Sequence, residues 1–318
     1  MKHRNICIVA LFLPLMALSQ TDSMEYYAHD ATMADSLRDY NREINDYTLQ
    51  IKRVTDDWDA YYNRGLAESR IQDYENARND YNYIVKNDTQ TALGYMGLGF
   101  LNKDLKRYHE SIKDFDTAIH RDSTNFMAYY IRGIDEDKIG KYGPAIKDFN
   151  IVIKLNPRFG NVYYTRGLVK SHVGKDESAI KDFDKALQLQ PDSVIVYNDR
   201  GVSEGKIGRL NEAILDLDKA VKYFPNSYKV YCNRGIAESM LNKLNESVKD
   251  FDKAIELKPE LAEGFYNRAL VYAKFYQYNH ALPDFQTAQK LYSDSGDTAM
   301  VTTVKKDIKE LKRVMGSK

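Results

Sequence analysis

A fixed internal period constrains this chain more than any other feature of its sequence. Residues 62–69 read YNRGLAES and residues 232–239 read CNRGIAES, and five equal steps along the chain separate the two. A small residue recurs at every step, as Gly65, Gly99, Gly133, Gly167, Gly201, Gly235 and Ala269. An unbroken period of this kind is typical of stacked supersecondary units, because each unit buries its apolar face against its neighbours.

Three further positions repeat in every block. An aromatic stands four residues before the small residue: Tyr61, Tyr95, Tyr129, Tyr163, Tyr197, Tyr231 and Phe265. A second small residue follows it after twelve positions: Ala77, Ser111, Ala145, Ala179, Ala213, Ser247 and Ala281. Four residues further on stands a large apolar residue: Tyr81, Phe115, Phe149, Phe183, Leu217, Phe251 and Phe285. Spacings of this kind place side chains on one helix face, so each block predicts two helices packed as an antiparallel pair.

The pattern resembles the tetratricopeptide repeat family, whose W-x2-L-G-x2-Y, A-x3-F and P positions recur over the same length. The matching blocks are 58–91, 92–125, 126–159, 160–193, 194–227, 228–261 and 262–295. The resemblance implies an all-α, right-handed superhelical solenoid of antiparallel helix pairs, with a concave groove lined by the first helix of each pair. It also implies a scaffold or adapter that binds a peptide or a partner protein.

Residues 1–19 have the layout of a secretory signal peptide, with basic residues ahead of a short apolar run in MKHRNICIVALFLPLMALSQ. A membrane span needs about 20 apolar residues, whereas this run is shorter and contains Pro14. A buried N-terminal helix is the alternative, but it leaves the basic residues unexplained. We therefore expect a mature chain that begins near Gln20, has no stable membrane span, and is periplasmic or extracellular.

The two ends of the repeat array are expected to be capped. Residues 20–57 contain a degenerate copy of the block, because Tyr47 falls in phase with Tyr81. Residues 296–318 predict a closing helix, whose apolar face is Val301, Val304, Ile308, Leu311 and Val314. Its other face carries Lys305, Lys306, Lys309, Lys312 and Arg313. We expect that basic face to be solvated, and contact with an anionic surface is the alternative.

The chain departs from the family pattern before the small residue, where arginine replaces leucine. The arginines are Arg64, Arg132, Arg166, Arg200, Arg234 and Arg268, and only Leu98 keeps the family type. An aspartate recurs in every block, as Asp80, Asp114, Asp148, Asp182, Asp216, Asp250 and Asp284. We interpret each Arg and Asp as an ion pair between the two helices of a block that fixes their register. Asp114, which lacks the arginine, should then be more exposed or paired with another cation.

Two alternatives to this interpretation stay open. A glutamate follows the arginine by four residues at Glu68, Glu136, Glu204 and Glu238, with Lys170 as an exception. Such an Arg and Glu could form a solvated pair on one helix, which contributes only about 0.2–0.5 kcal/mol. The repeated Arg and Asp could also be a remnant of sequence duplication and have no structural role.

No catalytic, metal or cofactor motif is found in the sequence. The six histidines show no H-E-x-x-H spacing, and no glycine-rich loop precedes a helix in the way that phosphate sites require. Lys plus Arg and Asp plus Glu are equal at 46 each, without a basic patch interleaved with aromatics. We therefore expect neither an enzyme nor a cofactor, and no nucleic acid as partner. Only Cys232 would remain in the mature chain, which excludes an internal disulfide.

The family resemblance places one row of first-helix residues in the groove: Tyr62, Met96, Tyr130, Tyr164, Asn198, Cys232 and Tyr266. Some family members hold a terminal carboxylate with lysines in this row and asparagines in the row four residues later, and neither occurs here, so contacts from aromatic and hydrogen-bonding groups are expected. The alternative is that these residues pack between successive first helices. Two ligand classes follow: an extended segment of another protein, or a small molecule or glycan bound by the tyrosines.

Overall fold

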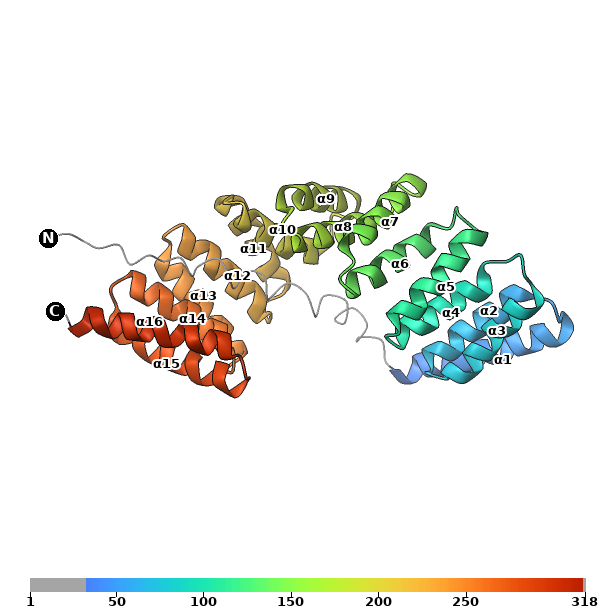
Figure 1. Cartoon of the computed structure of the whole chain (residues 1–318), viewed down its shortest axis with the longest axis horizontal. Helices are drawn as coiled ribbons and strands as arrows, with labels where there is room; N and C mark the ends of the chain where they lie inside the picture. The colour runs from blue at the N-terminus through green and yellow to red at the C-terminus, as the bar shows by residue number, and fades with distance from the viewer. Residues whose placement is uncertain (1–32, 317–318) are drawn as a thin grey trace. The chain divides into compact units, whose positions relative to one another are not determined.

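The computed structural model describes residues 33–316, and all their regular structure is helical. The predicted signal peptide and residues 20–32 lie outside the described residues. The helices, as Figure 1 shows along the chain, are α1 Met33–Arg53, α2 Trp58–Arg70, α3 Tyr74–Asn87, α4 Leu93–Asp104, α5 Tyr108–Arg121, α6 Phe126–Lys138, α7 Tyr142–Leu155, α8 Gly160–His172, α9 Asp176–Leu189, α10 Val194–Lys206, α11 Leu210–Tyr223, α12 Tyr228–Met240, α13 Leu244–Leu257, α14 Ala262–Lys274, α15 Tyr278–Asp294 and α16 Thr298–Gly316.

The described helices divide into two compact units. The N-terminal unit contains α1–α9 and ends at Gln190, and the C-terminal unit begins at Pro191 and contains α10–α16. Helices α2–α15 occur as pairs at the predicted period, each first helix being 12 or 13 residues long. No helix among the described residues is both long enough and apolar enough to cross a membrane.

The small residue of each block lies where the second helix comes closest. A Cβ atom on Gly65 would lie 2.6 Å from a ring carbon of Tyr81, and one on Gly167 would lie 2.6 Å from Phe183. Both distances are far below a van der Waals contact, so glycine is what allows these rings to pack against the first helix. The large apolar residues that do this are buried in all seven pairs: Tyr81, Phe115, Phe149, Phe183, Leu217, Phe251 and Phe285.

The turn inside each pair has one backbone form, whichever residue occupies it. Gly140, Gly174 and Gly208 have φ of 76°, 73° and 82°. The same position in the other pairs is Gln72, Lys106, Asn242 and Tyr276, with φ from 58° to 64°. These four residues take the left-handed conformation, which is uncommon for a residue with a side chain. Packing of the two helices therefore determines the turn, and glycine only makes it less costly.

One additional helix packs on the first pair of the N-terminal unit, and another packs on the last pair of the C-terminal unit. Helix α1 packs on α2, and residues 40–53 of α1 correspond in phase to the second helix of a pair. Helix α16 packs on α15 and buries Val304, Ile308 and Leu311 against Tyr292 and its neighbours. Both caps cover apolar surface that a further repeat would otherwise bury.

Candidate functional site: the arginine ladder and the first-helix faces

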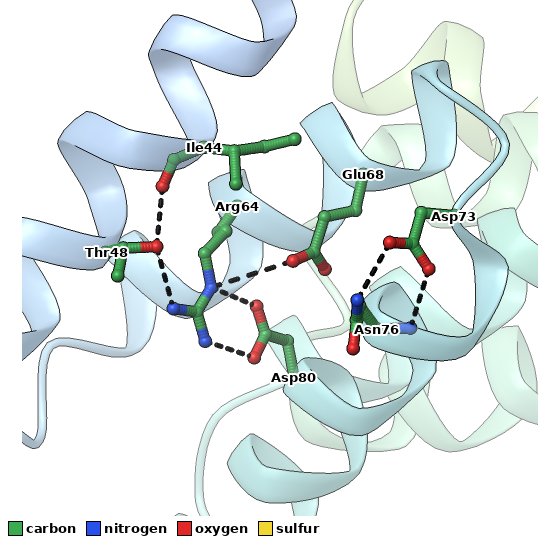
Figure 2. A network of polar contacts seen from close by, with 7 residues as sticks. All are labelled: Ile44, Thr48, Arg64, Glu68, Asp73, Asn76 and Asp80. Carbon is green, nitrogen blue, oxygen red and sulfur yellow. Dashed lines mark hydrogen bonds and ion pairs between the residues drawn. The ribbon is translucent and has the colours of Figure 1, made fainter.

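The recurring arginines form bidentate ion pairs with the recurring aspartates. Arg64 on α2 donates through Nε and Nη2 to the two carboxylate oxygens of Asp80 on α3, at 2.7 and 2.6 Å (Figure 2). The same two-pronged geometry joins Arg132 to Asp148, Arg166 to Asp182, Arg200 to Asp216, Arg234 to Asp250 and Arg268 to Asp284, at 2.6–2.9 Å. The planar guanidinium matches the carboxylate and fixes the angle between the two helices as well as their distance.

A third donor of the arginine reaches back to the preceding helix, a contact that sequence reasoning missed. Arg64 Nη1 donates to Thr48 Oγ1 on α1 at 3.1 Å, and Arg132 Nη1 donates to Asp116 on α5 at 2.6 Å. Corresponding bonds run from Arg166 to Asn150, from Arg234 to Asp218 and from Arg268 to Asp252. Each of these five arginines therefore joins its own pair to the helix before it. We call the contacts of the recurring arginines the arginine ladder.

Each ladder arginine also lies over the aromatic ring three residues earlier. The guanidinium carbon is 5.4–5.8 Å from the ring centroid in all six cases, over Tyr61, Tyr129, Tyr163, Tyr197, Tyr231 and Phe265. A cation at this distance from a ring contributes about 0.5–1 kcal/mol at a partly exposed site. The aromatic and arginine positions of the block thus form a single packing unit.

The block with Leu98 has a different arrangement, as expected. Asp114 accepts a hydrogen bond of 2.7 Å from the Asn102 amide and is only half-buried, whereas the other six ladder aspartates are buried. Of the two predicted outcomes, greater exposure is therefore the one that occurs, and the partner is neutral. Desolvation raises the pKa of Asp114, since Asn102 and the more distant Arg78 only partly oppose that effect.

The predicted groove row is partly buried. Tyr62, Tyr130 and Tyr164 are half-buried, and their rings lie 6.0 Å from those of Tyr81, Phe149 and Phe183. The hydroxyl of Tyr130 lies 3.0 Å from Thr165 Oγ1 on the next first helix. Half-buried Asn198 accepts a hydrogen bond from the Asn233 amide. These residues therefore pack between first helices and keep part of their surface exposed.

Three residues of that row are buried, and for Tyr266 and Met96 this corrects the sequence prediction. Tyr266 is 1% exposed, because α16 covers it and its hydroxyl donates to Asp307 at 2.9 Å. Met96 is 5% exposed. Its helix α4 approaches the preceding pair so closely that a Cβ on Gly94 would lie 2.7 Å from Val85. Cys232 is fully buried as well, which raises the pKa of its thiol and makes it a packing residue.

Comparisons with protein families identify the repeat. A model described as tetratricopeptide repeat matches residues 59–89 and 160–193, and one described as TPR repeat matches residues 240–274. The chain is a tetratricopeptide repeat protein. No match by sequence was found among curated proteins.

Solved structures of tetratricopeptide repeat proteins share its fold. One is YrrB, "a TPR protein with an unusual peptide-binding site", with 18% identity, 58% of this chain and 95% of that chain covered, and a TM-score of 0.53. A repeat protein from Parabacteroides merdae has 19% identity, coverage of 80% and 98%, and a TM-score of 0.57. The APC/C hetero-tetramer Cut9–Hcn1 has 14% identity, coverage of 86% and 52%, and a TM-score of 0.59. At these identities the likeness shows an all-α solenoid of helix pairs and nothing about ligands.

A row of largely buried glutamates lies next to the ladder of this repeat protein. Desolvation and, to a lesser extent, the charge of the ladder aspartate beside each raise the pKa of Glu68, Glu136 and Glu238 to about 7, although the ladder arginine acts in the opposite direction. Arg64 Nε is 3.9 Å from Glu68 Oε1, well beyond its 2.7 Å bond to Asp80. Glu68 is buried, so this longer ion pair is not the solvated Arg and Glu pair of the alternative.

The variant block shows what a cation does at the glutamate position. Lys170 Nζ lies 2.7 Å from Asp182 Oδ2, so in that block two cations share one carboxylate.

Within residues 33–316, no three side chains of His, Cys, Asp or Glu are grouped so that they could hold a metal ion. The charged groups of the ladder are thus occupied by one another, whereas the half-buried first-helix tyrosines keep part of their surface exposed.

Proposed function

We propose that the chain binds an extended segment of another protein on the first-helix face of its N-terminal unit, formed by α2, α4, α6 and α8. Half-buried tyrosines on three of these four helices carry the proposal. Tyr62, Tyr130 and Tyr164 occupy one position of the repeat and keep part of each ring exposed. Tyrosine suits such a surface because its ring is apolar and its hydroxyl is polar.

Differences between copies support a ligand that does not repeat. The packing positions of the blocks are nearly constant, whereas the half-buried members of this row change from tyrosine in α2, α6 and α8 to Asn198 in α10. In a repeat array each unit contacts only its neighbours, so packing positions must match while exposed positions are free to differ. An extended polypeptide presents a different side chain to each repeat and fits that variation.

Binding of a small molecule or glycan is the weaker candidate. Stacking on a sugar or a flat ligand requires an open ring face, but the rings of Tyr62, Tyr130 and Tyr164 each contact a second-helix aromatic. YrrB, which has the same fold, has a peptide-binding site. A scaffold or adapter role, without catalysis, is therefore the function we propose.

Capture of a partner by the Tyr62→Ala, Tyr164→Ala variant is expected to fall about 30-fold or more. Truncating one interface hot spot typically costs about 2 kcal/mol or more, and near-zero net charge leaves little electrostatic attraction to compensate. The measurement is quantitative pull-down from a cell-envelope extract, followed by titration of the identified partner. Tyr130 is left intact because its ring packs edge-on against Phe159 at 4.8 Å and its loss would lower stability.

The matched control is Tyr142→Ala, Leu155→Ala in the same unit. Both of these residues are on the second helix α7 and are 37% and 41% exposed. Melting followed by circular dichroism should show that both double variants remain folded. Equal loss of capture in the two variants, or none in the first, would show that the first-helix face is not the binding site.

We further propose that the chain is exported, on the strength of its N-terminal sequence. The basic start and short apolar run should direct translocation and cleavage after Ser19. N-terminal sequencing of the chain recovered from cell envelope or medium should yield a sequence that begins near Gln20. Recovery of an uncleaved chain from the cytosol would refute export while leaving the binding proposal intact.

A further inference from the structure

Helix α16 has two faces of opposite character. Val304, Ile308 and Leu311 are buried on the neighbouring helices and hold the helix in a fixed orientation. All five basic residues, Lys305, Lys306, Lys309, Lys312 and Arg313, are exposed. At about 100° per residue they fall within an arc of about 120°, so they form one face, which we call the α16 basic face.

The positive charge of this face is not balanced within the described residues. Only Arg313 forms an ion pair there, with Glu310 at 2.6 Å. The nearby Asp307 accepts a hydrogen bond from Tyr266 and so points toward the body of the unit. Among residues 33–316, Lys305, Lys309 and Lys312 have no carboxylate partner, unlike the ladder arginines, each of which has its aspartate. Capping alone requires the apolar face of α16 and does not explain four lysines on one exposed arc.

We propose that the α16 basic face binds an anionic lipid surface. Four of its five cations are lysines, which are compact point charges and lack the flat fork with which arginine recognises a particular carboxylate or phosphate. Helix α16 contains no aromatic residue on which a nucleic-acid base could stack. A cluster of lysines on an outward helix face suits a delocalised anionic surface, where each contributes independently.

The binding is peripheral and electrostatic. The apolar side chains of α16 are buried or partly buried against the neighbouring helices, so the exposed basic face has none to insert into the acyl region. Because the whole chain has equal numbers of acidic and basic residues, attraction arises from this face and not from net charge. Added salt should therefore weaken binding steeply, since exposed charges are screened over about 10 Å at about 0.1 M ionic strength.

The experiment is sedimentation of the full chain with vesicles of phosphatidylcholine alone or of phosphatidylcholine with phosphatidylglycerol. Wild type should bind only the second, and Lys305→Glu, Lys309→Glu, Lys312→Glu should bind at least about 100-fold more weakly. That figure follows because each lysine near an anionic surface strengthens binding about fivefold. A matched variant reverses three exposed lysines elsewhere, Lys181, Lys222 and Lys249, and should bind as wild type does.

Three outcomes would overturn the proposal. One is unchanged vesicle binding by the α16 variant, and another is an equal loss in the matched variant, which would attribute binding to net charge. The third is binding to soluble polyglutamate or to nucleic acid without binding to phosphatidylglycerol vesicles, which would assign the face to an acidic macromolecule. Thermal melting of both variants verifies that α16 still caps the unit.

Discussion

Asp182→Ala is expected to lower the free energy of unfolding by about 3 kcal/mol, the largest single effect that we predict for the ladder. Asp182 is buried and accepts bonds from Arg166 and Lys170 at 2.6–2.8 Å. Removing it leaves two cations at a mostly buried site with only the neutral Asn150 as partner. Breaking a buried pair in this way costs about 3–5 kcal/mol, and partial exposure of the cations favours the lower value.

The chain contains its own control for this variant. Asp114 is the equivalent aspartate in the block that has Leu98, and its partner is the amide of Asn102. Asp114→Ala removes a hydrogen bond but leaves no unpaired charge, so it should cost about 1 kcal/mol. Both losses are measured by urea unfolding, with hydrogen exchange in α8 and α9 to detect local opening, because a repeat array need not unfold in one step.

A double-mutant cycle separates the ion pair from other effects of truncation. Arg166→Leu, which copies the natural Leu98, is combined with Asp182→Ala, and the coupling between the two should be about 2 kcal/mol. Equal costs for Asp182→Ala and Asp114→Ala, or a coupling near zero, would contradict a structural role for the ladder. Because desolvation offsets much of the attraction in such pairs, their main role is to select one register between neighbouring helices.

The contacts within one block could be predicted from sequence, whereas contacts between blocks were missed. Arg166 and Asp182 recur in phase, so their pairing follows from the period alone. The bond from Arg166 to Asn150 crosses into the previous block, and a block-by-block comparison does not reveal it. The sequence did contain a signal for this bond. A polar residue that can accept a hydrogen bond recurs at one position of the repeat, two residues after the aspartate: Thr48 in the degenerate copy, then Asn82, Asp116, Asn150, Asp184, Asp218 and Asp252.

Exposure was harder to predict than helix pairing. Tyr266 occupies the same repeat position as Tyr62, yet α16 covers only the former. Likewise, Tyr276 turns the chain with φ of 62° at the position where three other blocks have glycine. In both cases the residue's own identity contains no signal, because neighbouring helices determine its surroundings. A repeat pattern therefore predicts the common framework of the pairs and not the residues at which copies differ.

Replacing three glutamates by glutamine is expected to stabilise the protein at pH 8 by about 1–2 kcal/mol per site. The variant is Glu68→Gln, Glu136→Gln, Glu238→Gln. In the folded chain these groups have a pKa of about 7, compared with an ordinary 4.5. One unit of pKa corresponds to about 1.4 kcal/mol, so the stabilisation gained by removing one buried glutamate charge is at most about 3 kcal/mol. Glutamine resembles the protonated acid and can donate to the aspartate beside it.

The direction of the pH dependence follows from which state holds the proton. Between about pH 4.5 and pH 7 the unfolded chain releases protons from these glutamates, whereas the folded chain retains them. Stability from this source is therefore fully present below pH 4.5, is lost as the pH rises toward 7, and stays low above it. The wild-type protein should become more stable as the pH falls from 8 to 6, and the triple variant should show much less of this change.

Exposed glutamates are the matched control for this prediction. Glu75, Glu177 and Glu246 lie in the first turns of second helices and are exposed. Their replacement by glutamine should give no stabilisation at pH 8, and a loss of a few tenths of a kcal/mol, because a negative charge near a helix N-terminus is favourable. Urea unfolding of the three proteins at pH 6 and pH 8 measures both effects. A triple variant no more stable than wild type at pH 8 would mean that the ladder arginines neutralise these glutamates, and that burial beside the aspartates costs the fold nothing.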